Sequence, residues 1–148
     1  MKLFFQKIGT ALARQKWVIM SVIGAPLVVL TLHALSIRLA DEGMYWWDEP
    51  MLALGGAAIA CSVFFAMRFA RRRGVLPALP LWFEGVCSVG MVMTAGVVWE
   101  WYEWFLWVYY DPALNLTLDD ALKDLAYDVF GGILFFVGRV LATSEGED

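Results

Sequence analysis

Apolar residues run through this chain in four long stretches that short polar segments separate. A helix needs about 20 apolar residues to cross a hydrocarbon core roughly 30 Å thick, and each stretch approaches that length. The predicted spans are residues 17–37, 51–67, 79–110 and 121–142. The sequence therefore predicts an all-α integral membrane bundle of four transmembrane helices, with residues 1–148 forming a single transmembrane helical domain.

The composition supports a lipid environment, because 61% of the 148 residues are hydrophobic and only 18% are charged. So much apolar surface is atypical of a soluble domain of this length. Cys61 and Cys87 both fall within predicted spans and have no CxxC partner, so we expect buried thiols instead of a disulfide scaffold. No phosphate-binding loop or catalytic triad pattern is present, which sets aside soluble enzyme classes, and nucleic-acid binding is not expected.

Polar residues at the start of the fourth stretch make its boundary uncertain from hydropathy alone. Thr117 followed by Asp120 has the spacing of a capping box, which predicts a helix start at this point. Asp111 and Pro112 predict the end of the preceding helix. Pro26 predicts a kink in the first helix.

Basic residues indicate how the bundle is oriented. The side that carries only Arg38 and Lys123 should face outward, which makes the topology N-in/C-in with both termini cytoplasmic. A cleavable signal peptide is the alternative for the first stretch, but the apolar run is too long and a cleavage pattern is poor around Ala34 and Ser36. The basic residues on the inner side are Lys2, Lys7, Arg14, Lys16, Arg68, Arg71, Arg72, Arg73 and Arg139.

Small residues are concentrated in the last three stretches. Lipid gives helices no hydrophobic reason to associate, so close packing depends on small residues at the contact. We expect these positions to let helix backbones approach one another. They include Gly55, Gly56, Ala60, Gly85, Gly90, Gly96, Gly131, Gly132 and Gly138.

Carboxylates gather at one level of the predicted bundle. Glu100 and Glu103 are three residues apart, and Asp120, Asp124 and Asp128 follow one another at four-residue steps, so each set lies on one helix face. With a rise of about 1.5 Å per residue, both sets lie near the outer membrane boundary on neighbouring antiparallel helices. His33, the single histidine of the chain, reaches the same outer half from the first helix.

This arrangement predicts a site for a divalent cation or for protons. Asp128 is the deepest of these acids, and an intramembrane carboxylate is costly unless it is paired, protonated or solvated. The acids outnumber the nearby bases, so they either share protons or hold a cation. Oxygen ligands suit Mg²⁺, Mn²⁺ or Ca²⁺, whereas iron or zinc would need the histidine, and no organic cofactor is expected. The candidate metal ligands are Glu100, Glu103, Asp124, Asp128 and His33.

Structural alternatives exist for several of these acids. Glu100 and Glu103 could be interfacial residues within a Trp and Tyr belt. Asp119 and Asp120 could serve only to cap their helix and complement its dipole. For Glu84, near the cytoplasmic end, an ion pair with the cluster Arg71 to Arg73 is the simplest account.

The acidic pattern resembles a motif of an uncharacterised bacterial inner-membrane family of the YjdF type, and more distantly of VanZ-like membrane proteins. It reads Glu-x-x-Glu-Trp, a loop, then Asp-x-x-x-Asp-Leu-x-x-Asp-x-x-Gly. Glu103 and Asp128 stand where VanZ-like sequences tend to have amides. The resemblance implies a multi-pass protein of the bacterial inner (plasma) membrane. The residues that carry it are Glu100, Glu103, Trp104, Asp120, Asp124, Leu125, Asp128 and Gly131.

Two classes of function remain open from the sequence. In the first, a cation held by the carboxylates acts on or transports a phosphate-bearing envelope precursor or an ion, as an enzyme or as a transporter that encloses its pathway as a homodimer. In the second, the acids are structural and the protein is a non-catalytic interaction or assembly protein. In both cases the lipid bilayer is a partner, and a lipid-linked or ionic substrate belongs only to the first.

Overall fold

The computed structural model describes residues 20, 22–24, 27–35, 38, 45–110 and 117–144, and this part of the chain is all-α. A 3-10 turn η1 (Tyr45–Trp47) leads into three long helices, which are α2 (Asp48–Arg72), α3 (Leu81–Tyr109) and α4 (Leu118–Ser144). These three helices are long and apolar enough to cross a membrane, and a shorter apolar helix, Val22–Leu35, precedes them. A helical membrane bundle is confirmed, with three long spans and one shorter helix among the described residues.

Helices α2 and α4 extend beyond their predicted spans, whereas α3 lies within its span, and charged residues favour both ends of α2. Helix α2 starts three residues before the predicted span and continues five residues beyond it, with Asp48 and Glu49 in its first turn and Arg71 and Arg72 in its last. Acids near a helix N-terminus and bases near its C-terminus complement the helix dipole. Hydropathy alone therefore underestimated the length of α2.

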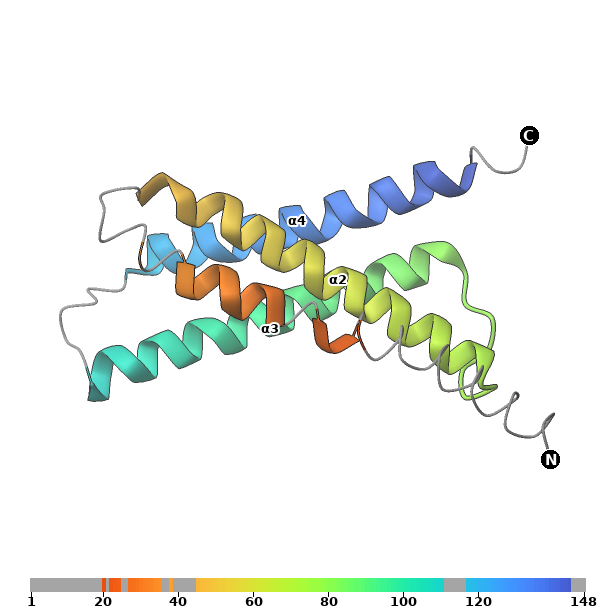
Figure 1. Ribbon diagram of the computed structural model, residues 1–148, viewed down its shortest axis with the longest axis horizontal. Helices are drawn as coiled ribbons and strands as arrows, with labels where there is room; N and C mark the ends of the chain where they lie inside the picture. The colour runs from red at the N-terminus through yellow and green to blue at the C-terminus, as the bar shows by residue number, and fades with distance from the viewer. Residues whose placement is uncertain are drawn as a thin grey trace, which may run out of the picture.

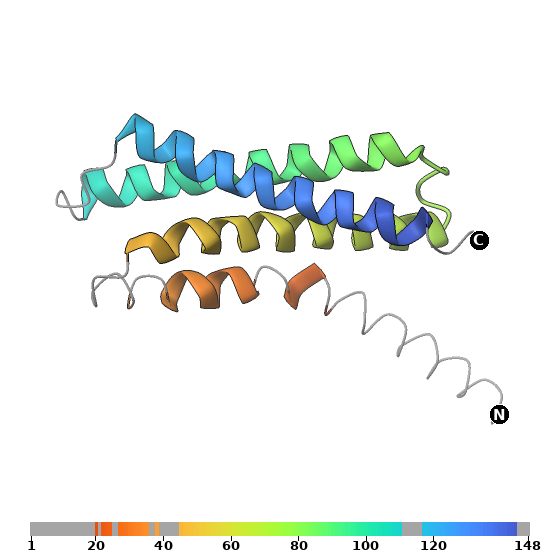
Figure 2. The ribbon, with the colours of Figure 1, turned by 90° about the horizontal axis from the view of Figure 1, so that it is seen from above.

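The three long helices alternate in direction (Figure 1). The N-termini of α2 and α4 and the C-terminus of α3 lie at one end, which we call the acidic end. The C-termini of α2 and α4 and the N-terminus of α3 lie at the other end, which we call the basic end. Seen from above, α2 lies between the helix Val22–Leu35 and the pair α3 and α4 (Figure 2).

Helices α2 and α4 make the most extensive contact, and two glycines bring their backbones together. A Cβ built on Gly56 would lie 1.9 Å from the carbonyl oxygen of Asp128, and one built on Gly131 would lie 1.8 Å from that of Ala53. The expected role of small residues is thus confirmed at this crossing. At Gly90 and Gly138, a Cβ would meet no atom within 4 Å.

Apolar side chains cover the outside of the bundle, and small or medium ones fill its inside. Leu54, Trp82, Trp101 and Leu141 are among many exposed large side chains, whereas Ala60 and Val92 are fully buried. This inverted pattern is expected for helices whose outer surface is solvated by lipid.

The basic end contains a buried ion pair. The Arg71 guanidinium donates to the carboxylate of Glu84, which is only 4% exposed. The pairing expected for Glu84 is therefore confirmed. Helix α2 ends next to it in a turn at Gly74, whose φ of +72° suits a residue without a side chain.

Some sequence predictions fall outside the described residues. They concern the N-terminal basic residues, the kink at Pro26 and the helix end at Asp111 and Pro112.

Candidate cation site

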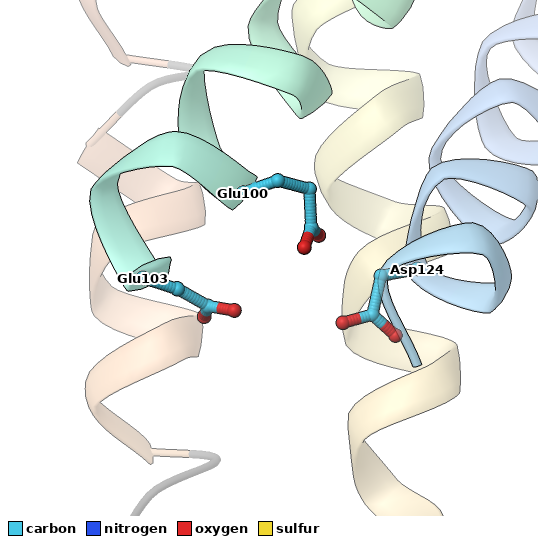
Figure 3. Close-up of side chains that lie close together, drawn as sticks. All are labelled: Glu100, Glu103 and Asp124. Carbon is cyan, nitrogen blue, oxygen red and sulfur yellow. The ribbon is translucent and has the colours of Figure 1, made fainter. Parts of the chain in front are cut away.

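Three carboxylates from two neighbouring helices converge at the acidic end. Glu100 and Glu103 project from α3 and Asp124 projects from α4, each partly buried, and one ligand oxygen from each lies within 4.8 Å of the others. Figure 3 shows the three carboxylates pointing into the same gap between α3 and α4. We call these three residues the acidic triad.

The helix geometry explains why these three side chains meet. Glu100 and Glu103 are one turn apart on α3 and therefore share a face. The Trp99 indole Nε1 donates a 2.8 Å hydrogen bond to Glu103 Oε1, which fixes the direction of that carboxylate. Trp99 and Glu103 are four residues apart, which is the spacing of neighbours on a helix face, and this spacing is the signal for the contact in the sequence.

The start of α4 sets the position of Asp124. The Asp120 backbone N–H donates to Thr117 Oγ1 at 3.2 Å, and the Thr117 hydroxyl donates to Asp120 Oδ2 at 2.6 Å. The predicted cap at Thr117 is therefore present, and it opens the helix at Leu118, three residues before the predicted span. Asp120 is engaged in this cap, whereas Asp124 lies one turn further along and joins the triad.

Asp128 lies one turn deeper and is not part of the triad. It is 9% exposed, and among the described residues its carboxylate has no hydrogen-bond or ion-pair partner. A Cβ built on Gly96 would lie 3.0 Å from Asp128 Oδ2, and one built on Gly55 would lie 3.7 Å from Oδ1. The carboxylate therefore occupies space that two glycines leave between α2 and α3.

A cavity of about 150 Å³ adjoins Asp128. Its walls come from all four helices and are mostly apolar, with the side chains of His33, Asp48 and Asp128 as the charged or titratable part. Asp48 precedes the predicted span 51–67, but it is the first residue of α2 and lines this cavity. Because α2 and α3 run antiparallel, the first turn of α2 lies beside the last turns of α3, and this places Asp48 at the acidic end (Figure 1).

His33 also lies outside the triad. Its ring packs edge-on against Trp99, with the ring centroids 4.6 Å apart. Because Trp99 in turn bonds to Glu103, the histidine is connected to the triad through one side chain. Of the five candidate ligands, the structure thus brings three together and places His33 and Asp128 at the neighbouring cavity.

The triad concentrates negative charge on three neighbouring side chains. Within the described ranges, none of its three carboxylates forms an ion pair with Lys or Arg. Two unit charges 4.8 Å apart repel by about 3 kcal/mol at an effective dielectric constant of ~20. A site of this kind is stabilised by anything that brings positive charge, which means a metal cation or protons.

Comparison with protein-family models matches most of this chain to one family. Residues 27–142 match the family described as "Predicted membrane protein (DUF2238)". The chain belongs to this family. The resemblance to the YjdF type is thereby confirmed, whereas the similarity to VanZ-like proteins stays a prediction. The DUF2238 match includes the whole triad, Asp128 and His33, and it agrees with the multi-pass membrane architecture. Neither the curated proteins nor the solved structures gave a match.

Proposed function

We propose that this protein binds a divalent cation, Mg²⁺, Mn²⁺ or Ca²⁺, at the acidic triad. The observation that carries the proposal is the approach of three carboxylate oxygens from α3 and α4 to within 4.8 Å of one another. Oxygens on opposite sides of such a cation are separated by about 4.0–5.2 Å, twice the usual metal–oxygen distance. Small side-chain rotations therefore suffice to bring all three oxygens onto one ion.

The donor set favours hard cations. The triad offers carboxylate oxygens only, and its polar neighbour Trp99 donates to Glu103 without competing for metal. Iron or zinc would prefer a nitrogen ligand, but the His33 ring packs against Trp99. Mg²⁺, Mn²⁺ and Ca²⁺ accept oxygen ligands together with water.

Asp128 supports the same proposal from outside the triad. An intramembrane carboxylate without a hydrogen bond is costly, and such residues mark functional sites. Glu100 lies within electrostatic range of Asp128, so a cation at the triad offsets the charge of both. We assign Asp128 an electrostatic role and the triad the role of ligands.

A phosphate-bearing envelope precursor is the substrate class that we propose. Glu100 forms part of a second cleft, of about 730 Å³, between the ends of α3 and α4. Trp101, Trp104 and Phe105 line it and suit the apolar part of a lipid-linked molecule. A metal ion between carboxylates and phosphate removes the repulsion between them, so a cation at Glu100 would position the phosphate in this cleft.

We further propose that the acidic end faces outward from the bacterial inner membrane, with both termini cytoplasmic. The excess of arginine at the basic end supports this orientation. Reporter tags on each terminus test it, because both tags should be active only as cytoplasmic reporters. A periplasmic C-terminus would reverse the orientation.

Mn²⁺ binding to the purified protein tests the central proposal. Electron paramagnetic resonance measures free Mn²⁺ directly and gives an equilibrium constant for the wild type, Asp124→Asn and Asp119→Asn. Asp119 is a matched control, because it is an exposed aspartate in the first turn of the same helix. We expect Asp124→Asn to weaken binding at least tenfold and Asp119→Asn to leave it within about twofold.

The same variants separate a cation site from a purely structural role. If the acids only hold the bundle together by shared protons, Asp124→Asn changes the melting temperature equally with Mn²⁺ and with EDTA. Equal Mn²⁺ affinity of the two variants would also rule out the triad as the site.

A further inference from the structure

A separate cleft lies at the basic end of the bundle, opposite the triad. It has a volume of about 340 Å³ and is bounded by the last turns of α2 and by the loop that leads to α3. The spacing i, i+3, i+4 places three arginines on one face of α2. The cleft is lined by Arg68, Arg71, Arg72, Leu76 and Ala78, and we call it the arginine cleft.

Among the residues that the structure describes, the arginine cleft carries more positive than negative charge. Arg71 pairs with the buried Glu84, but among the described residues neither Arg68 nor Arg72 has an acidic partner. Arg71, Arg72 and Arg139 all lie within electrostatic range of Arg68. A bound anion would stabilise Arg68 and Arg72, the two cleft arginines that lack an acidic partner among the described residues.

Three contacts hold the guanidinium groups of Arg68, Arg71 and Arg139 in place. The Arg68 guanidinium carbon lies 5.2 Å from the centroid of the Phe64 ring, which favours a cation over its face. Arg139 lies at the same distance from that ring. Arg71 is fixed by its pair with Glu84. Arg68 and Arg71 are therefore held in place before any ligand arrives, which lowers the entropy cost of binding.

An exposed tryptophan near the arginine cleft indicates that the cleft lies close to the lipid headgroups. Helix α3 begins at Leu81 beside the loop of the cleft, and Trp82 is 66% exposed. Exposed tryptophans at a helix end mark the membrane interface. The positive-inside rule accounts for the number of arginines here, but not for their convergence on a concave surface.

We propose that the arginine cleft binds the phosphate group of an anionic phospholipid headgroup. Arginine forms paired, charge-assisted hydrogen bonds to phosphate, and basic pockets at the cytoplasmic interface suit anionic headgroups. The C-terminal dipole of α2 opposes an anion with about half a unit charge, and the guanidinium groups of Arg68 and Arg72 outweigh it. Free inorganic phosphate shares this chemistry, so the test includes both sources.

Lipid-dependent stability of the full-length protein tests this proposal, measured in detergent with EDTA so that cation binding at the triad plays no part. Phosphatidylglycerol should raise the melting temperature by several degrees, and the same amount of phosphatidylcholine should raise it less. The double variant Arg68→Gln/Arg72→Gln should lose at least half of the rise. Arg73→Gln is the control, because that arginine packs on Phe69 and does not line the cleft.

The outcomes distinguish a phospholipid headgroup from free inorganic phosphate, and both from a nonspecific charge effect. Native mass spectrometry should show phosphatidylglycerol retained by the wild type and lost by the double variant. An equal rise with inorganic phosphate alone would contradict a lipid source. If phosphatidylglycerol raised the melting temperatures of the double variant and of Arg73→Gln equally, the arginine cleft would not be the binding site. If the double variant does not fold, Arg72→Gln and Arg72→Lys replace it, and only the lysine variant should keep part of the response.

Discussion

The close crossing of α2 and α4 makes Gly131→Ala the sharpest test of the bundle. The added Cβ would lie 1.8 Å from the Ala53 carbonyl oxygen, and real Cβ atoms essentially never approach another atom closer than 3.0 Å. The difference requires a displacement of about 1.2 Å, and the obstacle is backbone, which cannot rotate away. We therefore expect the upper part of the range for overpacking, about 1–3 kcal/mol.

Thermal unfolding in detergent measures this cost. One kcal/mol corresponds to about 2–4 °C for a chain of this size, so the melting temperature of Gly131→Ala should fall by about 5–10 °C. Gly138→Ala is the matched control, because it lies two turns along the same helix and its Cβ would meet no atom within 4 Å. Alanine is a better helix former than glycine by about 1 kcal/mol, so the control should be unchanged or more stable.

A second glycine tests whether the cost arises at this crossing. Gly56→Ala introduces a Cβ 1.9 Å from the Asp128 carbonyl oxygen in the same contact. Once one methyl group has separated the helices, the second has more room, so the double variant should lose less than the sum of the single variants. If Gly131→Ala and Gly138→Ala melt at the same temperature, the backbones are not in contact and the crossing is wrong.

Two further predictions concern the surroundings of the triad. Trp99→Phe removes the hydrogen bond to Glu103 and should weaken Mn²⁺ binding about tenfold. The control Trp101→Phe changes an exposed tryptophan and should leave Mn²⁺ binding unchanged. Equal Mn²⁺ affinities of the two variants would show that the hydrogen bond from Trp99 does not position the Glu103 carboxylate. Asp128→Asn removes a buried charge that repels Glu100, so it should raise the melting temperature in EDTA by a few degrees. The further rise in melting temperature on adding Mn²⁺ should then be smaller than in the wild type. An equal rise in both proteins would show that Asp128 does not interact electrostatically with the bound cation.

The sequence predicted those features that depend on local pattern. Hydropathy identified the three long helices, and the spacing of Thr117 and Asp120 identified the start of α4, because a cap involves only neighbouring residues. The pair between Glu84 and Arg71 followed from their shared depth at the cytoplasmic end of the predicted bundle.

The features that depend on helix crossing could not be predicted. Gly131 and Gly138 are seven residues apart and share a helix face, yet only Gly131 touches α2, because the helices cross there and then diverge (Figure 1). Asp124 and Asp128 are likewise one turn apart on α4, yet Asp124 joins the triad and Asp128 lines the cavity whose walls come from all four helices. Crossing angles depend on the packing of whole helices.

The most direct test of the cation site is anomalous diffraction from crystals of the wild type grown with Mn²⁺. We predict an anomalous peak between Glu100, Glu103 and Asp124, with carboxylate oxygens at about 2.0–2.6 Å from it. The peak should be absent from crystals of Asp124→Asn grown in the same way. A wild-type map at full Mn²⁺ concentration with ordered triad side chains and no peak between them would contradict the proposal.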